Sequence, residues 1–308
     1  MKVSIILATY NRNDLLIQTL QGLVNMDTTG LDWEVVLVDN AGNDETARLA
    51  ESFSASLPLK FLVEKAPGKN NALNSALGHA SGELIIFTDD DVIPDQAWVK
   101  SLVDAADRWK AADLFGGRIL PKFPEGTSAP SIDDPVFMRI AYVIADWDLP
   151  EGEHPAGKIW GPNMMVRRRV FDQGLRFNTH IGPTGSSYVM GSETDFLLRA
   201  SDAGHTAVYV PSAFVYHQIR QEQLTHAWIR GRAFRVGRGL AYHDKSVAVL
   251  EVKKWMLREI AGLYARYMYS CVVGTEEEKL QHAIRFHKMR GHIYQCYKGR
   301  SQEIQSPA

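Results

Sequence analysis

Short apolar runs alternate with stretches of helical spacing along the first 121 residues. The apolar runs are 3–8, 34–39, 59–64, 83–89 and 113–120, and the helical stretches are 13–26, 43–54, 69–80 and 95–110. Runs that are almost continuously apolar are typical of strands covered by helices on both faces. The pattern therefore predicts an α/β fold in which helices flank a mostly parallel sheet.

The pattern changes twice after residue 121. Segment 122–158 is rich in Pro, Gly and acidic residues and predicts a long loop. The chain then returns with a strand-like run at 158–166 and two strand-like pieces within 206–217. A helix is expected between them over 193–203, with Ser192 as its N-cap. After residue 220 only helical spacing remains, at 221–239, 247–273 and 276–297. We expect a sheet domain over 1–220, with halves 1–121 and 122–220, and a helical C-terminal region over 221–308.

Polar residues follow three of the expected strands. Thr9 and Tyr10 follow the first, Asp39 follows the second, and the acidic run 89–91 follows the fourth. Ligands of open α/β sheets bind outside the carboxyl ends of the strands, so these residues are expected to converge on one site.

The run Asp89, Asp90 and Asp91 places three like charges side by side, and such charges repel one another. Carboxylate oxygens suit Mg²⁺ or Mn²⁺, which complete their coordination with water and substrate phosphates. The alternative is a solvated acidic turn before a helix whose N-terminus favours acids. The position of the run, directly after an apolar strand, favours the metal.

The overall composition of the chain limits the classes of partner and compartment that are expected. The net charge of −2 and the pI near 6.6 lack the basic excess of proteins that bind nucleic-acid backbones, so no nucleic acid is expected. Cys271 and Cys296 have no metal-ligand spacing, which favours a reducing compartment. No stretch of the chain approaches 18 consecutive apolar residues, so no membrane-spanning helix is expected. We expect a cytoplasmic protein, or one held peripherally on the cytoplasmic face of a membrane.

Four segments in order resemble the family-2 glycosyltransferases of the GT-A fold, over about residues 2 to 240. They are VSIILATYNR, EVVLVDNAGNDET, GKNNALNSALGHASGELIIFTDDDVIP and GSETDFLLRASDAG. The resemblance implies an inverting, metal-assisted transfer of a hexose from a nucleotide-diphosphate donor, taken to be a UDP-sugar, to an acceptor hydroxyl. It assigns nucleotide binding to 1–121 and the acceptor to 122–220. The QxxRW motif of processive synthases is absent after residue 220, which implies a non-processive enzyme.

The resemblance also assigns the nucleotide contacts. Thr9 and Tyr10 would contact the nucleotide, and Asp39 would accept a hydrogen bond from its base. Asp90 belongs to the same binding set. Many members of the family make a phosphate or base contact with an Arg where Leu73 stands here, and Lys69 would substitute for that contact.

The metal ligands follow from the same comparison. Asp89 and Asp91 match the outer positions of the DxD motif, with Asp91 as a direct ligand and Asp89 nearer the ribose or the metal water. His217 would be a third ligand. Asn40 stands where the family usually has a second acid.

Glu193 matches the catalytic base of the family, and Asp195 is the alternative base or an acceptor contact. In-line displacement needs a base for the nucleophile and stabilisation of the leaving diphosphate. Two other functions remain open: a sugar nucleotidyltransferase, and an inactive scaffold that retains the fold. A dehydrogenase is disfavoured because no G-x-G-x-x-G follows the first strand.

The C-terminal helices interleave basic and aromatic residues. Such amphipathic helices can lie on an anionic membrane, which a lipid-linked sugar acceptor would explain. Packing against the catalytic domain and homodimer formation are the alternatives. The acceptor is accordingly expected to be a sugar or a lipid-linked sugar.

Overall fold

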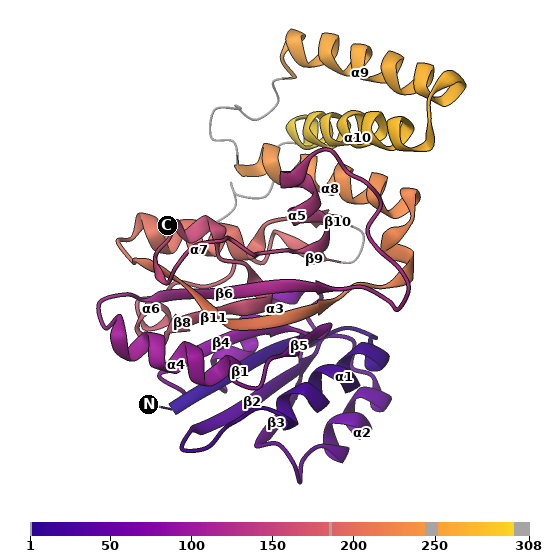
Figure 1. Ribbon diagram of the computed structural model, residues 1–308. Coiled ribbons are helices and arrows are strands. Elements are labelled where there is room, and N and C mark those ends of the chain that lie inside the picture. Colours follow the sequence, from indigo (N-terminus) through magenta and orange to yellow (C-terminus); the bar gives the residue numbers. More distant parts are fainter. Residues whose placement is uncertain (1, 185–186, 244–251, 299–308) are drawn as a thin grey trace. The chain divides into compact units, whose positions relative to one another are not determined.

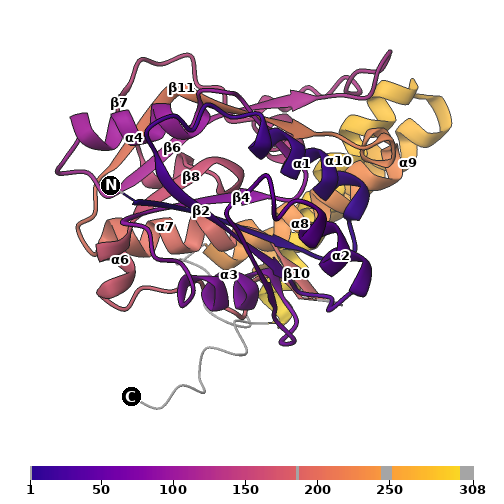
Figure 2. The ribbon, with the colours of Figure 1, turned by 90° about the horizontal axis from the view of Figure 1, so that it is seen from below.

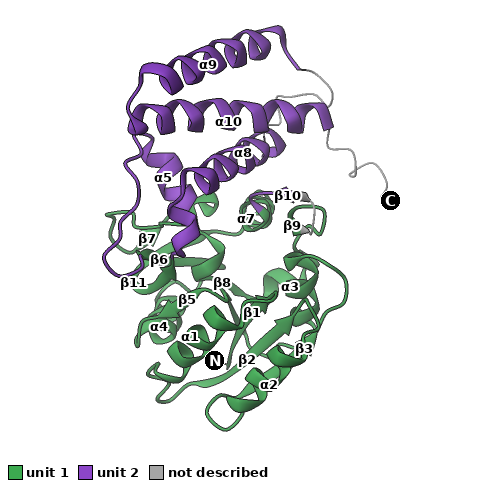
Figure 3. Cartoon of the chain, turned by 90° about the vertical axis from the view of Figure 1, so that its right-hand side faces the viewer, with its two compact units in different colours: residues 1–122, 143–186, 192–218 green, residues 123–142, 187–191, 219–308 purple. Residues whose placement is uncertain are grey.

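The computed structural model describes residues 2–184, 187–243 and 252–298, and these residues form two compact units (Figure 3). The first unit holds 1–122, 143–186 and 192–218, and the second holds 123–142, 187–191 and 219–308. The segments 123–142 and 187–191 thus group with the C-terminal helices. The expected domain boundary at residue 220 stays a prediction.

A nine-stranded sheet forms the centre of the first unit, in the order β3-β2-β1-β4-β8-β6-β11-β5, with β7 paired to β11. Its strands are β1 (Lys2–Thr9), β2 (Asp32–Asp39), β3 (Leu59–Val63), β4 (Leu84–Asp89), β5 (Val92–Pro94), β6 (Leu114–Lys122), β7 (Gly152–Glu153), β8 (Met164–Arg167) and β11 (Ala207–Gln218). Neighbouring strands from β3 to β4 are parallel, whereas β8 runs antiparallel to both β4 and β6. The strands β9 (Gly182–Thr184) and β10 (Ser187–Val189) lie outside this sheet.

Helices cover both faces of this sheet, as Figure 2 shows for α1 and α4 on one side and α3, α6 and α7 on the other. The bounds are α1 (Asn13–Val24), α2 (Asp44–Ser52), α3 (Lys69–Leu77), α4 (Trp98–Arg108), α6 (Arg168–Asp172) and α7 (Ser192–Asp202). Alternate residues of β1 enter different cores: Ile5 packs with α1 and α4, and Ile6 packs with α3 and α7. This period of two explains why the strand reads as continuously apolar.

The predicted α/β architecture is confirmed, with three local differences. The expected loop 122–158 contains helix α5 (Pro135–Tyr142) and β7. The two strand-like pieces of 206–217 form one strand, β11, with an irregularity between Val210 and Phe214. The acidic run is followed by the short strand β5 before the next helix begins. The strand differences depend on pairing between distant segments, which local spacing does not encode.

The second unit contains α5 and the helices α8 (His226–His243), α9 (Lys254–Val273) and α10 (Glu276–Lys298) (Figure 1). Helices α8 and α10 pack closely because each has a glycine at the contact. A Cβ on Gly237 would lie 1.9 Å from the carbonyl oxygen of Lys288, and one on Gly291 would lie 1.9 Å from that of Phe234. Only glycine allows the two backbones to approach this closely.

Helix α9 is mostly exposed. Only Met256 and Ser270 are buried, while Trp255, Leu257, Tyr264, Met268, Tyr269, Val272 and Val273 are exposed. None of the described helices combines the length and apolar character that crossing a membrane would need. Contact of these helices with a membrane surface or with a second copy stays a prediction.

Glu34 of β2 ties the start of β4 to the sheet. Its Oε1 accepts hydrogen bonds from the Ser4 hydroxyl at 2.6 Å and from the Ser81 backbone N–H at 2.6 Å, and its Oε2 lies 2.7 Å from Lys60 Nζ. Burial opposes ionisation, but these partners outweigh burial and lower the pKa of Glu34 from 4.5 to about 2. The folded state therefore favours the carboxylate.

We expect Glu34→Gln to lower the free energy of unfolding by about 2 kcal/mol at pH 7, because charge-assisted hydrogen bonds are lost. The depressed pKa means that this stabilisation is complete above pH 4.5 and is lost as the pH falls toward 2. Urea unfolding across this range measures the difference. Glu51→Gln, on the exposed face of α2, is the control. An equal loss at both ends of the range would contradict an ionic role.

Candidate active site

Strand register brings the predicted polar residues to one edge of the sheet. Thr9 is the direct neighbour of Asp39, and Ala8 is the neighbour of Asp89. Asp39 is fully buried, and its two carboxylate oxygens accept hydrogen bonds from the backbone N–H groups of Ala41 and Asn43 at 2.8 and 2.6 Å. Parallel strands thus bring together residues that lie 30 and 81 positions apart in the chain, as the sequence pattern predicts.

Lys69, at the first turn of α3, joins two of the predicted site residues. Its Nζ lies 2.6 Å from Asp89 Oδ1 and 2.7 Å from Glu193 Oε1. All three side chains are about four-fifths buried. An ammonium group between two carboxylates balances part of their charge, so Lys69 holds the end of β4 and the start of α7 together.

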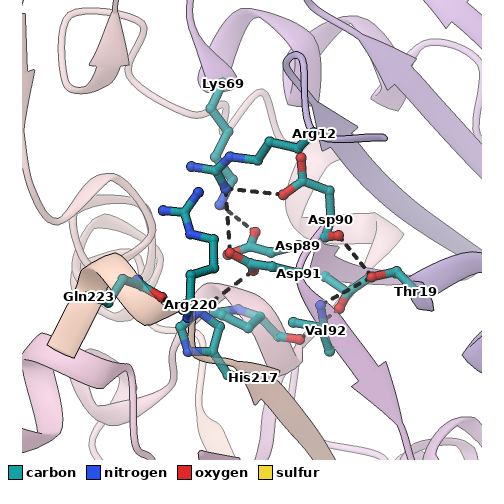
Figure 4. A network of polar contacts seen from close by, with 12 residues as sticks. Arg12, Thr19, Lys69, Asp89, Asp90, Asp91, Val92, His217, Arg220 and Gln223 are labelled. Carbon is teal, nitrogen blue, oxygen red and sulfur yellow. Dashed lines mark hydrogen bonds and ion pairs between the residues drawn. The ribbon is translucent and has the colours of Figure 1, made fainter. Parts of the chain in front are cut away.

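Asp90 points toward β1 and α1. Its Oδ2 accepts a hydrogen bond from the Thr9 hydroxyl at 2.8 Å, and its backbone oxygen accepts one from Thr19 at 2.9 Å. Arg12 Nη1 lies 3.3 Å from Asp90 Oδ1 and 3.4 Å from Asp91 Oδ2 (Figure 4). The hydroxyl hydrogen of Thr9 is thus used within the protein. Arg12 was not among the predicted site residues.

Asp91 faces His217. His217 Nε2 lies 3.6 Å from Asp91 Oδ1, an ion-pair distance that is too long for a hydrogen bond. Pairing of β11 with β5 fixes this approach, because His217 is the neighbour of Val92 and the Gln218 N–H donates to the Asp91 backbone oxygen at 2.8 Å. The antiparallel register therefore joins two residues that lie 126 positions apart in the chain.

The three adjacent acids differ in protonation tendency. Burial raises the pKa of Asp89, and Asp91 and Glu193 add to this, while Lys69 opposes it. Burial also raises the pKa of Asp90 to about 6. Burial opposes ionisation of Asp91 too, but His217 and Arg12 outweigh it and lower the pKa to about 2. Asp91 is therefore the acid of the run that most favours the charged form.

Glu193, at the start of α7, is closely packed between Ser192, Lys69 and Gly161. Its Oε2 accepts a hydrogen bond from the Ser192 hydroxyl at 2.8 Å, and burial is outweighed by Lys69, which lowers the Glu193 pKa to about 2. A Cβ on Gly161 would lie 2.7 Å from Glu193 Cγ, so a larger residue at 161 would displace the Glu193 side chain. Asp195 Oδ2 instead pairs with Arg199 Nε at 2.9 Å, within the same helix. Ser192 was expected to cap the helix but lies inside it.

Asn40 holds the loop that carries Lys69. Its Nδ2 donates hydrogen bonds to the carbonyl oxygens of Glu64 and Ala66 at 2.8 and 2.7 Å, and its Oδ1 accepts one from the Gly68 N–H at 2.8 Å. A carboxylate could not donate to these carbonyl oxygens. In the sequence, the only sign of this role is that Asn40 stands where the family usually has an acid. The contacts of Asn40 with the loop explain why an amide is needed there.

The residues near Asp91 fit a divalent cation in part. Asp91 Oδ1 is buried without a hydrogen-bond partner, and a buried carboxylate oxygen in this state favours a cation. No three His, Cys, Asp or Glu side chains within the described ranges form a complete metal cluster. Mg²⁺ and Mn²⁺ need only one or two carboxylates when substrate phosphates and water supply the remaining ligands. Tyr10, the residue that follows β1, is 61% exposed.

The family model for glycosyl transferase family 2 matches residues 4–175, more than half of the chain. The chain belongs to this family. This glycosyltransferase is 25% identical over 262 residues to glycosyltransferase AglE of Haloferax volcanii, covering 84% of this chain and 76% of the relative. It is 23% identical over 256 residues to the glucosyl-dolichyl phosphate glucuronosyltransferase of the same organism, covering 77% and 75%.

Solved structures support the fold. The mannosyltransferase PcManGT of Pyrobaculum calidifontis, in complex with GDP-Man and Mn²⁺, matches with a TM-score of 0.63 at 18% identity, covering 95% of this chain and 87% of that chain. S. aureus TarS 1–349 with UDP-GlcNAc matches with a TM-score of 0.57 at 18% identity, covering 98% and 92%. The predicted GT-A architecture and glycosyltransferase class of this enzyme are confirmed.

We expect Lys69→Met to lower the free energy of unfolding of this glycosyltransferase by about 3 kcal/mol, because Asp89 and Glu193 lose the buried cation between them. Chemical denaturation measures the loss. Lys65→Met, on the exposed part of the preceding loop, removes the same charge and is the control. If both variants lose the same free energy, the bridge contributes nothing specific.

Proposed function

We propose that this glycosyltransferase transfers a hexose from a nucleotide-diphosphate donor to an acceptor hydroxyl with inversion at the anomeric carbon. The observation that carries the proposal is the convergence of Asp89 and Glu193 on Lys69, beside Asp91 and His217. The arrangement sets a candidate base next to candidate groups for a diphosphate and a metal. A nucleotidyltransferase or an inactive scaffold gives no reason for a fitted, buried Glu193.

In the proposed reaction Glu193 removes the proton of the acceptor hydroxyl. The acceptor oxygen then forms a bond to the anomeric carbon on the face opposite the diphosphate, and the bond from that carbon to the leaving oxygen breaks. A divalent cation bound at Asp91, whose buried Oδ1 has no hydrogen-bond partner, would act as a Lewis acid for the leaving diphosphate, and phosphate oxygens and water would supply its other ligands. Asp39, Thr9, Tyr10 and Asp90 lie at or beneath the edge proposed for the nucleotide.

In this proposal Lys69 pairs with Glu193 before the donor binds and contacts the donor phosphates afterwards. While it pairs with Glu193, a pKa of about 2 makes that carboxylate a poor proton acceptor. Phosphate oxygens of a bound donor would compete with the carboxylates for the Lys69 ammonium group, so donor binding would draw Lys69 away and leave Glu193 more basic. The base would then be active only when the donor is present, which disfavours misdirected proton transfer.

The donor and acceptor are proposed from chemistry shared with relatives. UDP is the proposed nucleotide, since the TarS structure holds UDP-GlcNAc, although the PcManGT structure holds GDP-Man. The name of one Haloferax relative describes a dolichyl phosphate-linked sugar as its substrate. A sugar or lipid-linked sugar is therefore the proposed acceptor.

Thermal unfolding with UDP, GDP, dTDP and CDP tests the nucleotide site, each with and without Mn²⁺. We expect UDP with Mn²⁺ to raise the melting temperature, because a ligand that binds only the folded state stabilises it. Asp91→Ala should remove the Mn²⁺-dependent part of the shift, whereas Asp195→Ala should retain it. A wild-type protein that responds to no nucleotide would contradict the proposal.

Glu193→Gln and Asp195→Asn distinguish the two candidate bases with matched changes. We expect Glu193→Gln to reduce kcat by about 10²- to 10⁴-fold through loss of the general base. Asp195→Asn should stay within a few-fold of wild type, because Asp195 is paired with Arg199. Release of nucleoside diphosphate from the donor measures turnover, and nucleotide binding checks that both variants are folded. The opposite ranking would assign the base to Asp195.

A further inference from the structure

Two arginines of α8 lie on one side of Trp228. Arg232 and Arg235 are three positions apart and therefore neighbours on the helix surface. The Cζ atoms of Arg232 and Arg235 lie 5.7 and 6.0 Å from the centre of the Trp228 ring, and Arg235 Cζ is also 5.7 Å from the Tyr188 ring. Aromatic faces thus hold both guanidinium groups in place.

The hydrogen-bonding capacity of this pair is largely unused. Arg232 is 9% exposed, and its Nη2 donates to the carbonyl oxygen of Ile140 at 2.9 Å. The Nε atoms of Arg232 and Arg235 are both buried and have no hydrogen-bond partner in the described part of the chain. Within those same residues, neither side chain pairs with a carboxylate.

Two like charges in this setting are unfavourable. Burial, followed by the charge of Arg232, lowers the pKa of Arg235. A buried donor without an acceptor also costs free energy, since it has lost its hydrogen bonds to water. An anion with several oxygens would relieve both costs at once.

We propose that Arg232 and Arg235 form a binding site for a phosphoryl group. Guanidinium groups offer planar, paired donors that match phosphate oxygens, and two of them can share one phosphate or span a diphosphate. The Nε atoms supply unused donors, and the rings of Trp228 and Tyr188 fix their planes. The site lies in the second unit and uses none of the residues of the candidate active site, so the inference stands independently of the proposed function.

Binding of inorganic pyrophosphate to the full chain tests the site. EDTA is present throughout, so that metal bound near Asp91 makes no contribution, and NaCl at matched ionic strength corrects for general salt effects. Calorimetry gives the affinity, and thermal unfolding reports folding. We expect Arg235→Gln to weaken pyrophosphate binding by about tenfold or more, as expected when a charge-assisted contact is lost.

Arg258→Gln, on exposed α9, makes the same change in net charge and should bind pyrophosphate like wild type. Without ligand, Arg235→Gln should melt at or above the wild-type temperature, because an unpaired, partly buried charge has been removed. Arg232→Lys keeps the charge but loses the paired donors, so it should also weaken binding.

The same variants identify the source of the phosphoryl group. In a separate measurement with Mn²⁺ and without EDTA, weaker UDP binding in Arg235→Gln would assign the site to the donor nucleotide. Unchanged UDP binding, with lost binding to phosphatidylglycerol vesicles but not to phosphatidylcholine controls, would assign it to a lipid phosphate. The proposal is overturned if wild type binds no pyrophosphate, or if Arg235→Gln binds it equally well. Mn²⁺-dependent nucleotide binding in that case would leave the proposed function intact.

Discussion

The contact of the Lys69 ammonium group with Asp89 and Glu193 is the interaction on which the candidate active site depends. Asp89 ends β4 and Glu193 begins α7, so the two carboxylates come from distant parts of the chain. Two acids brought together with most of their surface buried would repel each other and favour protonation. One cation between them allows Glu193 to stay ionised at its fitted position against Gly161.

Several less obvious residues support this contact. Asn40 gathers the loop from Glu64 to Gly68 and so sets the position at which α3 begins. The side chain of Asp90 accepts a hydrogen bond from Thr9 of β1, and its backbone oxygen accepts one from Thr19 of α1, so Asp90 is held by both elements. The run therefore divides its work: Asp89 pairs with Lys69, Asp90 anchors the strand to α1, and Asp91 faces His217. Asp90 of this acidic run thus has a structural role, whereas Asp89 and Asp91 belong to the candidate active site.

The helices of the second unit differ in how closely they pack. Glycines at the crossing of α8 and α10 allow two long helices to approach at backbone contact, whereas α9 leaves most of its apolar side chains exposed. In the same unit, Arg232 and Arg235 lie against the Trp228 ring, and their buried Nε donors have no hydrogen-bond partner among the residues that the structure describes. Unused donors in a tightly packed unit are costly, which is why they point to a ligand.

Local patterns of the sequence determined much of this protein. The alternating apolar runs predicted the α/β sheet, and polar residues after β1, β2 and β4 had to meet because parallel strands end at one edge. The position of the acidic run after an apolar strand predicted a metal site, whereas Glu193 and His217 were found through their resemblance to a family. Tertiary structure alone decided that Lys69 lies between Asp89 and Glu193, that Arg12 joins Asp90 and Asp91, and that Asn40 supports the loop. Such contacts depend on side-chain direction and strand register between distant segments, and neither is encoded in local spacing.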